Sequence, residues 1–256
     1  RSRRSRRTRP LAVHVTFAGS HTSLLTLRRS NVAIVPLCTR ASSPMPNDIP
    51  VQRKIMSTPY DPVARLFLAQ DRRPAHLEGV GPGELSPLQR ALLVIDGTVT
   101  SFLSAWALEP VIVRPLAQCA GVLPGDAGPA GGQPLAAPWL EAPAGTPVMT
   151  RAVLLVGADS QRLFAFAESV ICTGRLPAAL RAGLEAGGLS LGQLLLMPGF
   201  ESRREGLWYG RERPATLPPA VAALTSPDFL TRTYRVSAAS QPLMVITERF
   251  PWSLRE

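Results

Sequence analysis

Two pairs of alternating apolar and polar runs constrain the fold of this chain more than any other feature. The first pair covers 147–156 and 162–172, and the second covers 229–237 and 242–250. Within each pair, four or five residues join the two runs. A period of two is typical of strands that bury one face, and short connections join antiparallel neighbours. The sequence therefore predicts two β-hairpins.

Helical segments are expected before and between these hairpins. Ser86 and Pro87 fit the N-cap and first position of a helix that ends at Ile95. A second helix is expected from Thr98 to Trp106, after a break at Asp96-Gly97. A third helix is expected at 177–186, a short apolar helix or turn at 190–197, and a strand at 110–116. Hairpins with helices between them predict an α+β domain, in which helices flank a single antiparallel β-sheet.

The basic residues are unevenly distributed, and this predicts the domain organisation. The formal net charge is +10, but residues 1–56 hold 11 basic residues and one acid, which leaves 17 of each sign in 57–256. We expect 1–56 to be a disordered leader and 57–256 to be one folded domain, with a Pro/Gly-rich loop at 121–138. Because the excess charge lies in the leader, no nucleic-acid partner is expected for the domain.

The leader allows three interpretations. Its Arg-, Ser- and Thr-rich, acid-poor composition suits an organelle transit peptide, a nucleic-acid-binding tail, or a stretch upstream of a start codon assigned too early. Met45 and Met56 offer later starts, which favours the third interpretation. A cytoplasmic location is expected, with import through the leader left open.

Missing residue types narrow the chemistry. Residues 77–256 contain no histidine, so catalysis by Ser-His-Asp or Cys-His and a histidine-based zinc site are not expected. No phosphate-binding or dinucleotide-binding motif is present. No apolar run is long enough to cross a membrane, and the three cysteines lack metal-site spacing. We expect chemistry without a metal or cofactor, or binding alone.

Charged residues on apolar strand faces are the best candidates for a site. Glu248 shares a predicted face with Met244, Ile246 and Phe250, and Arg151 shares one with Val153. A buried charge is costly unless it is paired or has a function. If Gly157 pairs with Arg162, simple counting places Arg151 opposite Glu168, which allows a structural ion pair. The alternative is that Arg151 and Glu248 face one cavity, where Arg151 binds a carboxylate.

Two further charged groups are candidates. Arg203, Arg204 and Glu205 form a cluster, expected in a loop, that either clamps an anion or is only solvated. Tyr234 and Arg235 are neighbours on a predicted strand, so at most one of them reaches a given pocket.

An ordered series of short motifs resembles the chorismate pyruvate-lyase (4-hydroxybenzoate synthase) family. The motifs span about 85–250, most of the folded part. They are Leu85-Ser-Pro87, Asp96-Gly-Thr-Val-Thr100, Thr150-Arg-Ala-Val-Leu-Leu155, Ser190-Leu-Gly-Gln-Leu194, Gly206-Leu-Trp208 and Pro242-Leu-Met-Val-Ile-Thr-Glu248.

The resemblance implies a fold, a reaction and a set of site residues. It implies an antiparallel sheet whose flanking helices enclose a buried site, where pyruvate is eliminated from chorismate to give 4-hydroxybenzoate without a cofactor. Arg151 matches an arginine that holds a ligand carboxylate, Glu248 a glutamate at the far end of the site, and Leu191 a backbone contact. Val99 falls near an apolar contact. Arg204 and Arg235 are candidates for a second positive charge.

One departure from the family pattern leaves alternatives open. Ala167-Glu168-Ser169 stands where the best-characterised branch carries a second arginine. The chain is therefore expected to be a lyase, a non-catalytic sensor domain that binds a small acid, or a relative that keeps the pocket without turnover. In each case the partner is a small molecule, and the protein is a monomer or small homo-oligomer.

Overall fold

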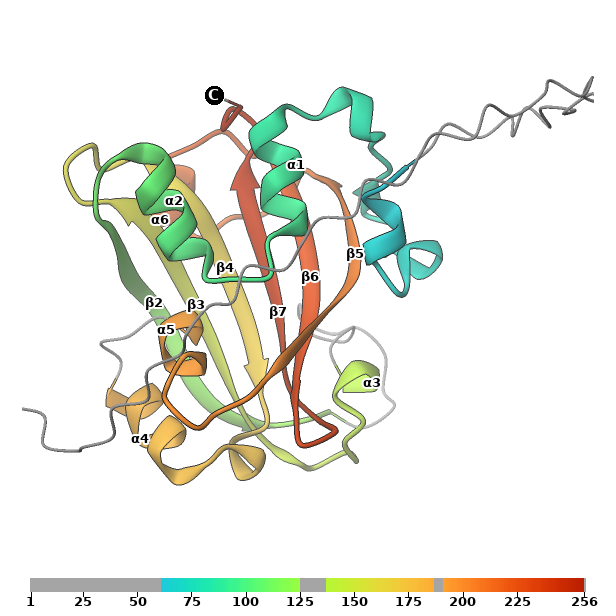
Figure 1. Cartoon of the computed structure of the whole chain (residues 1–256), viewed down its shortest axis with the longest axis vertical. Coiled ribbons are helices and arrows are strands. Elements are labelled where there is room, and N and C mark those ends of the chain that lie inside the picture. The colour runs from blue at the N-terminus through green and yellow to red at the C-terminus, as the bar shows by residue number, and fades with distance from the viewer. Residues whose placement is uncertain (1–60, 125–136, 187–190, 256) are drawn as a thin grey trace, which may run out of the picture. The chain divides into compact units, whose positions relative to one another are not determined.

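A seven-stranded antiparallel sheet organises the computed structural model, which describes residues 61–124, 137–186 and 191–255 (Figure 1). The strand order across the sheet is β1-β5-β6-β7-β4-β3-β2. The strands are β1 (Leu77–Glu78), β2 (Val111–Val122), β3 (Pro147–Gly157), β4 (Leu163–Ile171), β5 (Arg203–Glu212), β6 (Phe229–Ala238) and β7 (Gln241–Pro251). The α+β class with a single antiparallel sheet is confirmed.

Both predicted hairpins are present, as β3–β4 and β6–β7. Gly157 N donates to Arg162 O at 3.0 Å, so the first turn closes as counting suggested. The second turn is formed by Ala239 and Ser240, whose φ angles are 48° and 63°. A tight hairpin turn needs positive φ at its two central residues, and here the chain forms one without glycine.

A β-bulge in β4 changes which charges meet. Val156 pairs with Leu163 but Leu155 pairs with Ala165, so Phe164 is an extra residue in β4. Beyond it, Arg151 is opposite Ser169 rather than Glu168. A shift of one residue moves side chains to the other face of a sheet. The Arg151–Glu168 ion pair, one of the two alternatives for Arg151, is therefore wrong, and the two side chains belong to opposite faces.

A second bulge shifts the other hairpin in the same way. Ser237 pairs with Pro242 but Val236 pairs with Met244, which makes Leu243 the extra residue in β7. As a result, Arg232 of β6 lies opposite Glu248. Counting from the turn without the bulge would have placed Thr247 there.

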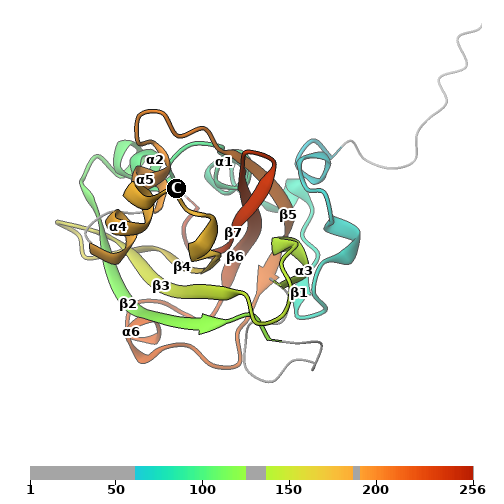
Figure 2. The ribbon, with the colours of Figure 1, turned by 90° about the horizontal axis from the view of Figure 1, so that it is seen from below.

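Four helices cover one face of the sheet, α1 and α2 over one part and α4 and α5 over another (Figures 1 and 2). They are α1 (Pro87–Val94), α2 (Val99–Ala107), α4 (Ala178–Ala186) and α5 (Leu191–Leu195); two single turns, α3 (Ala137–Leu140) and α6 (Pro219–Ala222), lie elsewhere. We call this the helix face. No helix among residues 61–124, 137–186 and 191–255 is long and apolar enough to span a membrane.

The paired helices α1 and α2 form as their sequence predicts. Ser86 Oγ accepts a hydrogen bond from Gln89 N at 3.2 Å, and Gln89 Oε1 accepts one from Ser86 N at 3.0 Å, which completes a capping box. Leu92 and Leu103 are fully buried against the sheet. The break between the two helices leaves 95–98 as a connection that runs over the sheet.

Strand β5 was not predicted, and the charged cluster expected in a loop belongs to it. The glycines of β5 explain why its sequence gives only a weak strand pattern and why another segment can lie against it. A Cβ atom on Gly206 would lie 2.9 Å from Leu66 O, and one on Gly210 would lie 2.6 Å from Glu78 O. The segment before α1 therefore packs directly on the backbone of β5.

Strand β2 is longer than expected. It extends to Val122, so Gly121 and Val122 pair with β3 instead of opening the Pro/Gly loop. Residues 125–136 of that predicted loop lie outside the described residues, as does the predicted leader, 1–56.

The second face of the sheet is concave and carries a polar band between two apolar ones. Val148, Val170 and Val245 belong to an apolar cluster on one side, and Leu154 and Phe166 belong to one on the other. Between them, strand register places Thr150, Ala152, Glu168, Thr231, Thr233, Thr247 and Arg249. The sheet curls so that β1 and β2, its two edges, both border the space over this band (Figure 2).

Candidate functional site

A cavity of about 60 Å³ lies between the sheet and the connections of the helix face. Five of the six residues suggested by the sequence line it: Val99, Arg151, Leu191, Arg204 and Glu248. They come from α2, β3, α5, β5 and β7 in turn. Segments spread over about 150 positions of the sequence thus meet in one enclosed space, which we call the helix-face cavity.

Arg151 projects from the middle of β3 into this cavity. Its side chain is buried, and it shares the cavity wall with Val153 and Leu155. Burial lowers the pKa of Arg151 from its usual value. An arginine starts so far above neutrality that it remains a cation, so Arg151 presents a desolvated guanidinium to the cavity.

Glu248, at the other side of the cavity, is held by two side chains from β6. Arg232 Nε donates to Glu248 Oε2 at 2.8 Å, and both residues are buried. Tyr234 Oη donates to Glu248 Oε1 at 3.2 Å. Burial raises the pKa of Tyr234, and the charge of Glu248 raises it further, so the phenol keeps its proton. A permanent cation and a neutral donor together hold the two oxygens of Glu248 in place.

Arg232 also fixes the helical cover of the cavity. Its Nη1 donates to the backbone oxygen of Ile95 at 3.1 Å and to that of Leu93 at 3.4 Å. These carbonyls end α1, where helical oxygens lack intrahelical partners. One buried side chain therefore links the end of α1 to the carboxylate of Glu248.

The N-terminal ends of α2 and α5 meet over the cavity. Gly97, Thr98 and Val99 line it from one side, and Leu191 and Gly192 line it from the other. A Cβ atom on Gly192 would lie 3.0 Å from Thr98 Cγ2, so only glycine allows this approach without a shift.

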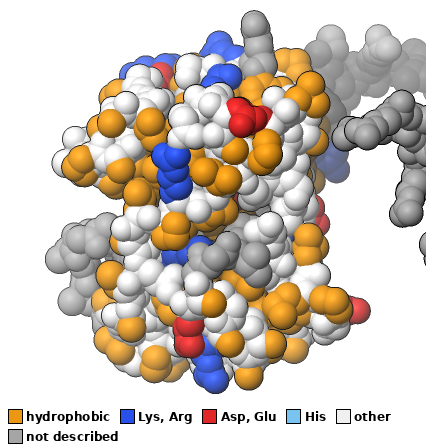
Figure 3. Space-filling view, turned by 90° about the vertical axis from the view of Figure 1, so that its left-hand side faces the viewer, with side chains coloured by type: hydrophobic (Ala, Val, Ile, Leu, Met, Phe, Trp, Pro, Cys, Tyr) orange, Lys and Arg blue, Asp and Glu red, His pale blue; other side chains and the backbone are white. Residues whose placement is uncertain are grey.

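Arg204 brings a second cationic side chain to the cavity. It projects from β5, donates to the backbone oxygen of Asp96, and has its Nη1 3.8 Å from Asp96 Oδ1. The Asp96 carboxylate is exposed, so this ion pair is weak. Figure 3 shows a hollow on this side of the molecule with basic side chains beside it.

Arg235, the sixth suggested residue, lies outside the helix-face cavity. Its Nε donates to Glu205 at 2.6 Å and its Nη1 to Glu141 at 2.7 Å, in a separate depression. Its neighbour Tyr234 is the residue of this pair that reaches the cavity. The alternation rule was correct, but the choice between the two neighbours was wrong.

Sequence reasoning missed Arg232 and Thr98, and it selected Arg235 rather than its neighbour Tyr234. Arg232 was hidden because the bulge at Leu243 shifts the pairing by one residue. The only signal that could have found it is the coincidence of two inward-facing opposite charges on adjacent strands of a predicted hairpin.

Glu168 lies in the segment where the best-characterised branch of the family carries a second arginine. Ala167, Glu168 and Ser169 all border the helix-face cavity, but the carboxylate of Glu168 lies on the concave face, where its Oε2 accepts from Arg249 Nη1 at 2.6 Å. The carboxylate does not compete for Arg151. Arg204, suggested by the sequence as a second positive charge, lines the cavity from β5.

The cavity as a whole is cationic. Arg151, Arg204 and Arg232 outnumber Glu248 at and behind its walls. Among the described residues, no group of three histidine, cysteine or carboxylate side chains is arranged to hold a metal ion. The fold and this cavity define an α+β protein with an enclosed site suited to a small anionic ligand.

The comparisons with known proteins identify the family. A family model described as "Chorismate pyruvate-lyase Rv2949c-like" matches residues 93–256. The chain belongs to this family. It is also 34% identical over 105 residues to proteins named chorismate pyruvate-lyase from Mycobacterium tuberculosis H37Rv and Mycobacterium bovis. That match covers 40% of this chain and 52% of each relative, so the chain spans about half the length of the curated relatives it matches.

Solved structures with low sequence identity are also similar to this chain. The effector domain of PhnF from Mycobacterium smegmatis has a TM-score of 0.46 at 12% identity, covering 62% of this chain and 90% of that one. The ligand-binding domain of a GntR-family regulator from Bordetella bronchiseptica has a TM-score of 0.38 at 16% identity, covering 55% and 84%.

Proposed function

We propose that this protein is a chorismate pyruvate-lyase, which eliminates pyruvate from chorismate to give 4-hydroxybenzoate. One observation carries the proposal: Arg151 and Glu248 line the same buried cavity, with Glu248 held in place by a hydrogen bond from Arg232. The family match over residues 93–256 supports the same reaction.

The spacing of the two residues suits a para-substituted ring. Arg151 lies on β3 and Glu248 on β7, with β4 between them, and their register differs by two residues. Two strand spacings and two residues place their Cα atoms roughly 12 Å apart. A six-membered ring with a carboxylate at one end and a hydroxyl at the other fills that span when each end makes a hydrogen bond of about 2.8 Å.

The elimination balances within the substrate. The ring carbon that bears the hydroxyl loses a proton, the ether C–O bond breaks, and the ring becomes aromatic. The enolpyruvate that leaves takes up a proton and becomes pyruvate. Since aromatisation supplies a large driving force, the site mainly has to hold the dianion in one orientation and stabilise charge on the departing oxygen.

Each cavity residue then has a role in the proposal. Arg151 binds the ring carboxylate in a bidentate manner, and Arg204 binds the carboxylate of the enolpyruvyl group. Glu248 accepts a hydrogen bond from the ring hydroxyl. Because Arg232 and Tyr234 both donate hydrogen bonds to its oxygens, we assign Glu248 the role of an acceptor rather than a proton donor. Leu191 and Val99 contribute backbone and apolar contacts.

Substrate binding requires the cavity to open. Its volume of about 60 Å³ holds a few water molecules but not a ring with two substituents. The exposed Arg204–Asp96 contact crosses from the sheet to the connection before α2, so its release frees that part of the cover. Arg204 would then change partner from Asp96 to the substrate.

A direct assay tests the proposal. The full chain is incubated with chorismate, and 4-hydroxybenzoate is followed by absorbance and chromatography, with 4-hydroxybenzoate binding measured by calorimetry. We expect product formation that Arg151→Ala lowers by at least a hundredfold. Folded protein that binds 4-hydroxybenzoate but forms no product would contradict the enzyme and favour a sensor of small aromatic acids. An Arg151→Ala variant that loses only thermal stability would contradict the assigned role of Arg151.

A further inference from the structure

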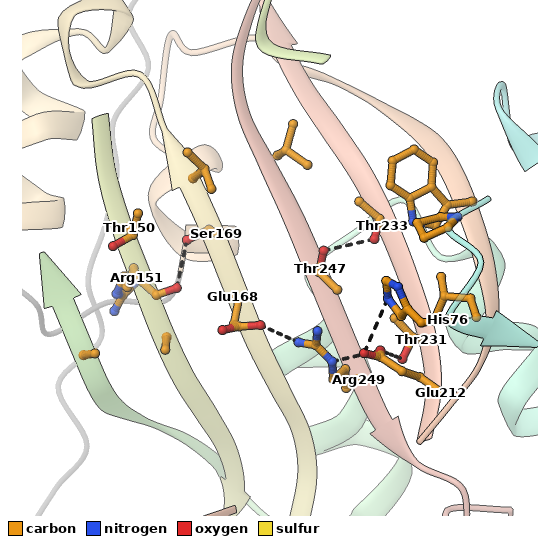
Figure 4. Close-up of a pocket in the computed structure, with 17 residues that line it drawn as sticks. His76, Thr150, Arg151, Glu168, Ser169, Glu212, Thr231, Thr233, Thr247 and Arg249 are labelled. Atoms are coloured by element: carbon orange, nitrogen blue, oxygen red, sulfur yellow. Dashed lines mark hydrogen bonds and ion pairs between the residues drawn. The ribbon is translucent and has the colours of Figure 1, made fainter. Parts of the chain in front are cut away.

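A second cavity of about 260 Å³ lies on the concave face, on the other side of the sheet from the helix-face cavity (Figure 4). We call it the concave cavity. Its walls come from the polar band of the sheet and from both edges, including His76 before β1 and Ala117 of β2. Of the residues assigned to the lyase reaction, only Arg151 also borders it, and it has about four times the volume of the helix-face cavity.

The centre of the concave cavity is a carboxylate, Glu212, whose hydrogen bonding is incomplete. Its Oε2 accepts from Thr231 Oγ1 at 2.7 Å and from Arg249 Nε at 2.9 Å. Its Oε1 accepts no hydrogen bond from any residue that the structure describes, and His76 Nε2 is 3.8 Å away. Glu212 is only 5% exposed, so this oxygen is directed at the cavity rather than at bulk water.

Arg249 is already committed to carboxylates. Its Nε binds Glu212 and its Nη1 binds Glu168 at 2.6 Å, as the dashed lines in Figure 4 show. Burial works against the charge of Arg249, but the two carboxylates outweigh it and raise the pKa of this arginine. Arg151 also borders this cavity, but strand alternation directs its side chain to the helix face. The side chains that face the cavity therefore include two carboxylates and one guanidinium, and they carry one net negative charge when His76 is neutral.

The remaining walls combine hydroxyl groups with apolar surface. Thr233 and Thr247 face the cavity as a hydrogen-bonded pair, 3.0 Å between their oxygens. Val170, Val245 and Trp208 lie on the side of the apolar cluster. A ligand with an apolar part and one group of hydrogen-bond donors matches this division.

The sign of the charge decides the class of ligand. A carboxylate ligand would lie against Glu212 and Glu168 without a guanidinium left to receive it, and would lose its hydration as well. An ammonium group would gain Glu212 Oε1 and threonine oxygens as acceptors. We propose that the concave cavity is a binding site for a small organic cation, an ammonium group attached to an aromatic or aliphatic body.

Three probes of nearly equal size and shape separate the possible charges: benzylamine, benzyl alcohol and benzoate. Binding to the full chain is measured by NMR on threonine methyl groups, because threonines line both cavities. Thr231, Thr233 and Thr247 report on the concave cavity, and Thr98 and Thr100 report on the helix-face cavity. We expect benzylamine to shift the first set and to bind at least tenfold more tightly there than the other two probes.

Two variants locate the charge responsible. Glu212→Gln removes the buried carboxylate, and Glu168→Gln removes the half-exposed one with little risk to the fold. Each is expected to weaken benzylamine binding about tenfold. Glu205→Gln is the control, since Glu205 pairs with Arg235 outside both cavities.

Four results would overturn the proposal. They are the absence of any shift with benzylamine, shifts confined to Thr98 and Thr100, equal affinity for all three probes, and unchanged affinity in a folded Glu168→Gln variant. Failure of the lyase assay would leave this result unaffected, because the two sites lie on opposite faces.

Discussion

Two buried glutamates in this protein are held in almost the same way on opposite faces of one sheet. Glu248 is bound by Arg232 and by the hydroxyl of Tyr234, and Glu212 is bound by Arg249 and by that of Thr231. The two pairs differ in the net charge of the groups around them. Arg232 donates its other hydrogen bonds to backbone oxygens, whereas Arg249 donates to a second carboxylate.

This difference shows that the local pair does not determine what a cavity can bind. On the helix face, Arg151 and Arg204 add two positive charges to a neutral pair, and the cavity suits an anion. On the concave face, Glu168 adds a negative charge to a similar pair, and the cavity suits a cation. The matched pairs also provide matched controls for mutation.

The largest effect is expected from removing the arginine of each pair. Arg232→Met leaves Glu248 as a buried charge and should lower the free energy of unfolding by about 3–5 kcal/mol. Arg249→Met should lower it less, because water in the concave cavity of about 260 Å³ can solvate Glu212, and Glu168 is half exposed. Urea denaturation of both variants measures the difference. Equal losses would mean that the two arginines contribute packing rather than charge compensation.

The glutamates themselves should separate function from structure. Glu248→Gln keeps the shape of the side chain but loses the acceptor charge, and kcat on chorismate should fall by about 10²–10³-fold. Glu212→Gln should leave kcat within about threefold of the unmodified protein, since it faces the other cavity. Steady-state kinetics of the two variants checks this, and a similar loss in both would contradict the assignment of the helix-face cavity as the active site.

Arg204 on β5 and Arg235 on β6 form a second matched pair, because each arginine is in an ion pair. Arg204→Gln should raise KM for chorismate about tenfold or more, because it removes a charged contact to a carboxylate. Arg235→Gln should leave KM unchanged, as its partners Glu205 and Glu141 lie in a separate depression. A higher KM in Arg235→Gln than in Arg204→Gln would mean that Arg235, and not Arg204, contacts the substrate.

The smallest effect concerns the hydroxyl donors. Tyr234→Phe and Thr231→Val each remove one hydrogen bond to a buried carboxylate and should each lower the free energy of unfolding by about 1–3 kcal/mol. Only Tyr234→Phe should also lower kcat on chorismate. Thermal denaturation and kinetics on the same samples test both statements, and a kinetic effect of Thr231→Val would show that the two faces are coupled.

Much of the fold could be predicted from local sequence, but the pairing of charges could not. The caps at Ser86 and Pro87 and the two hairpins follow from short-range patterns, and the structure contains them. The bulges at Phe164 and Leu243 depend on packing: each places two adjacent apolar side chains in clusters on the same side of the sheet. Local alternation carries no sign of such an extra residue.

The missed strand has a different cause. β5 begins with Arg203, Arg204 and Glu205 and contains Gly206 and Gly210, residue types that are poor strand formers. It becomes a strand because two neighbours supply pairing and because the segment before α1 lies against its glycines. Arg204 therefore could not be oriented from sequence, although its type had already suggested an anion site.

The bulge at Phe164 has a consequence for how such a protein can diverge. Deleting that one codon would remove the bulge but keep the register, because Leu155 would still pair with Ala165 and Arg151 with Ser169. Glu168 would stay on the concave face, so the charge of each cavity would be preserved. A one-residue deletion or insertion between Ala165 and Glu168 would instead turn Glu168 to the helix face. The contrast between the two cavities therefore tolerates loss of the extra residue but not a length change just beyond it.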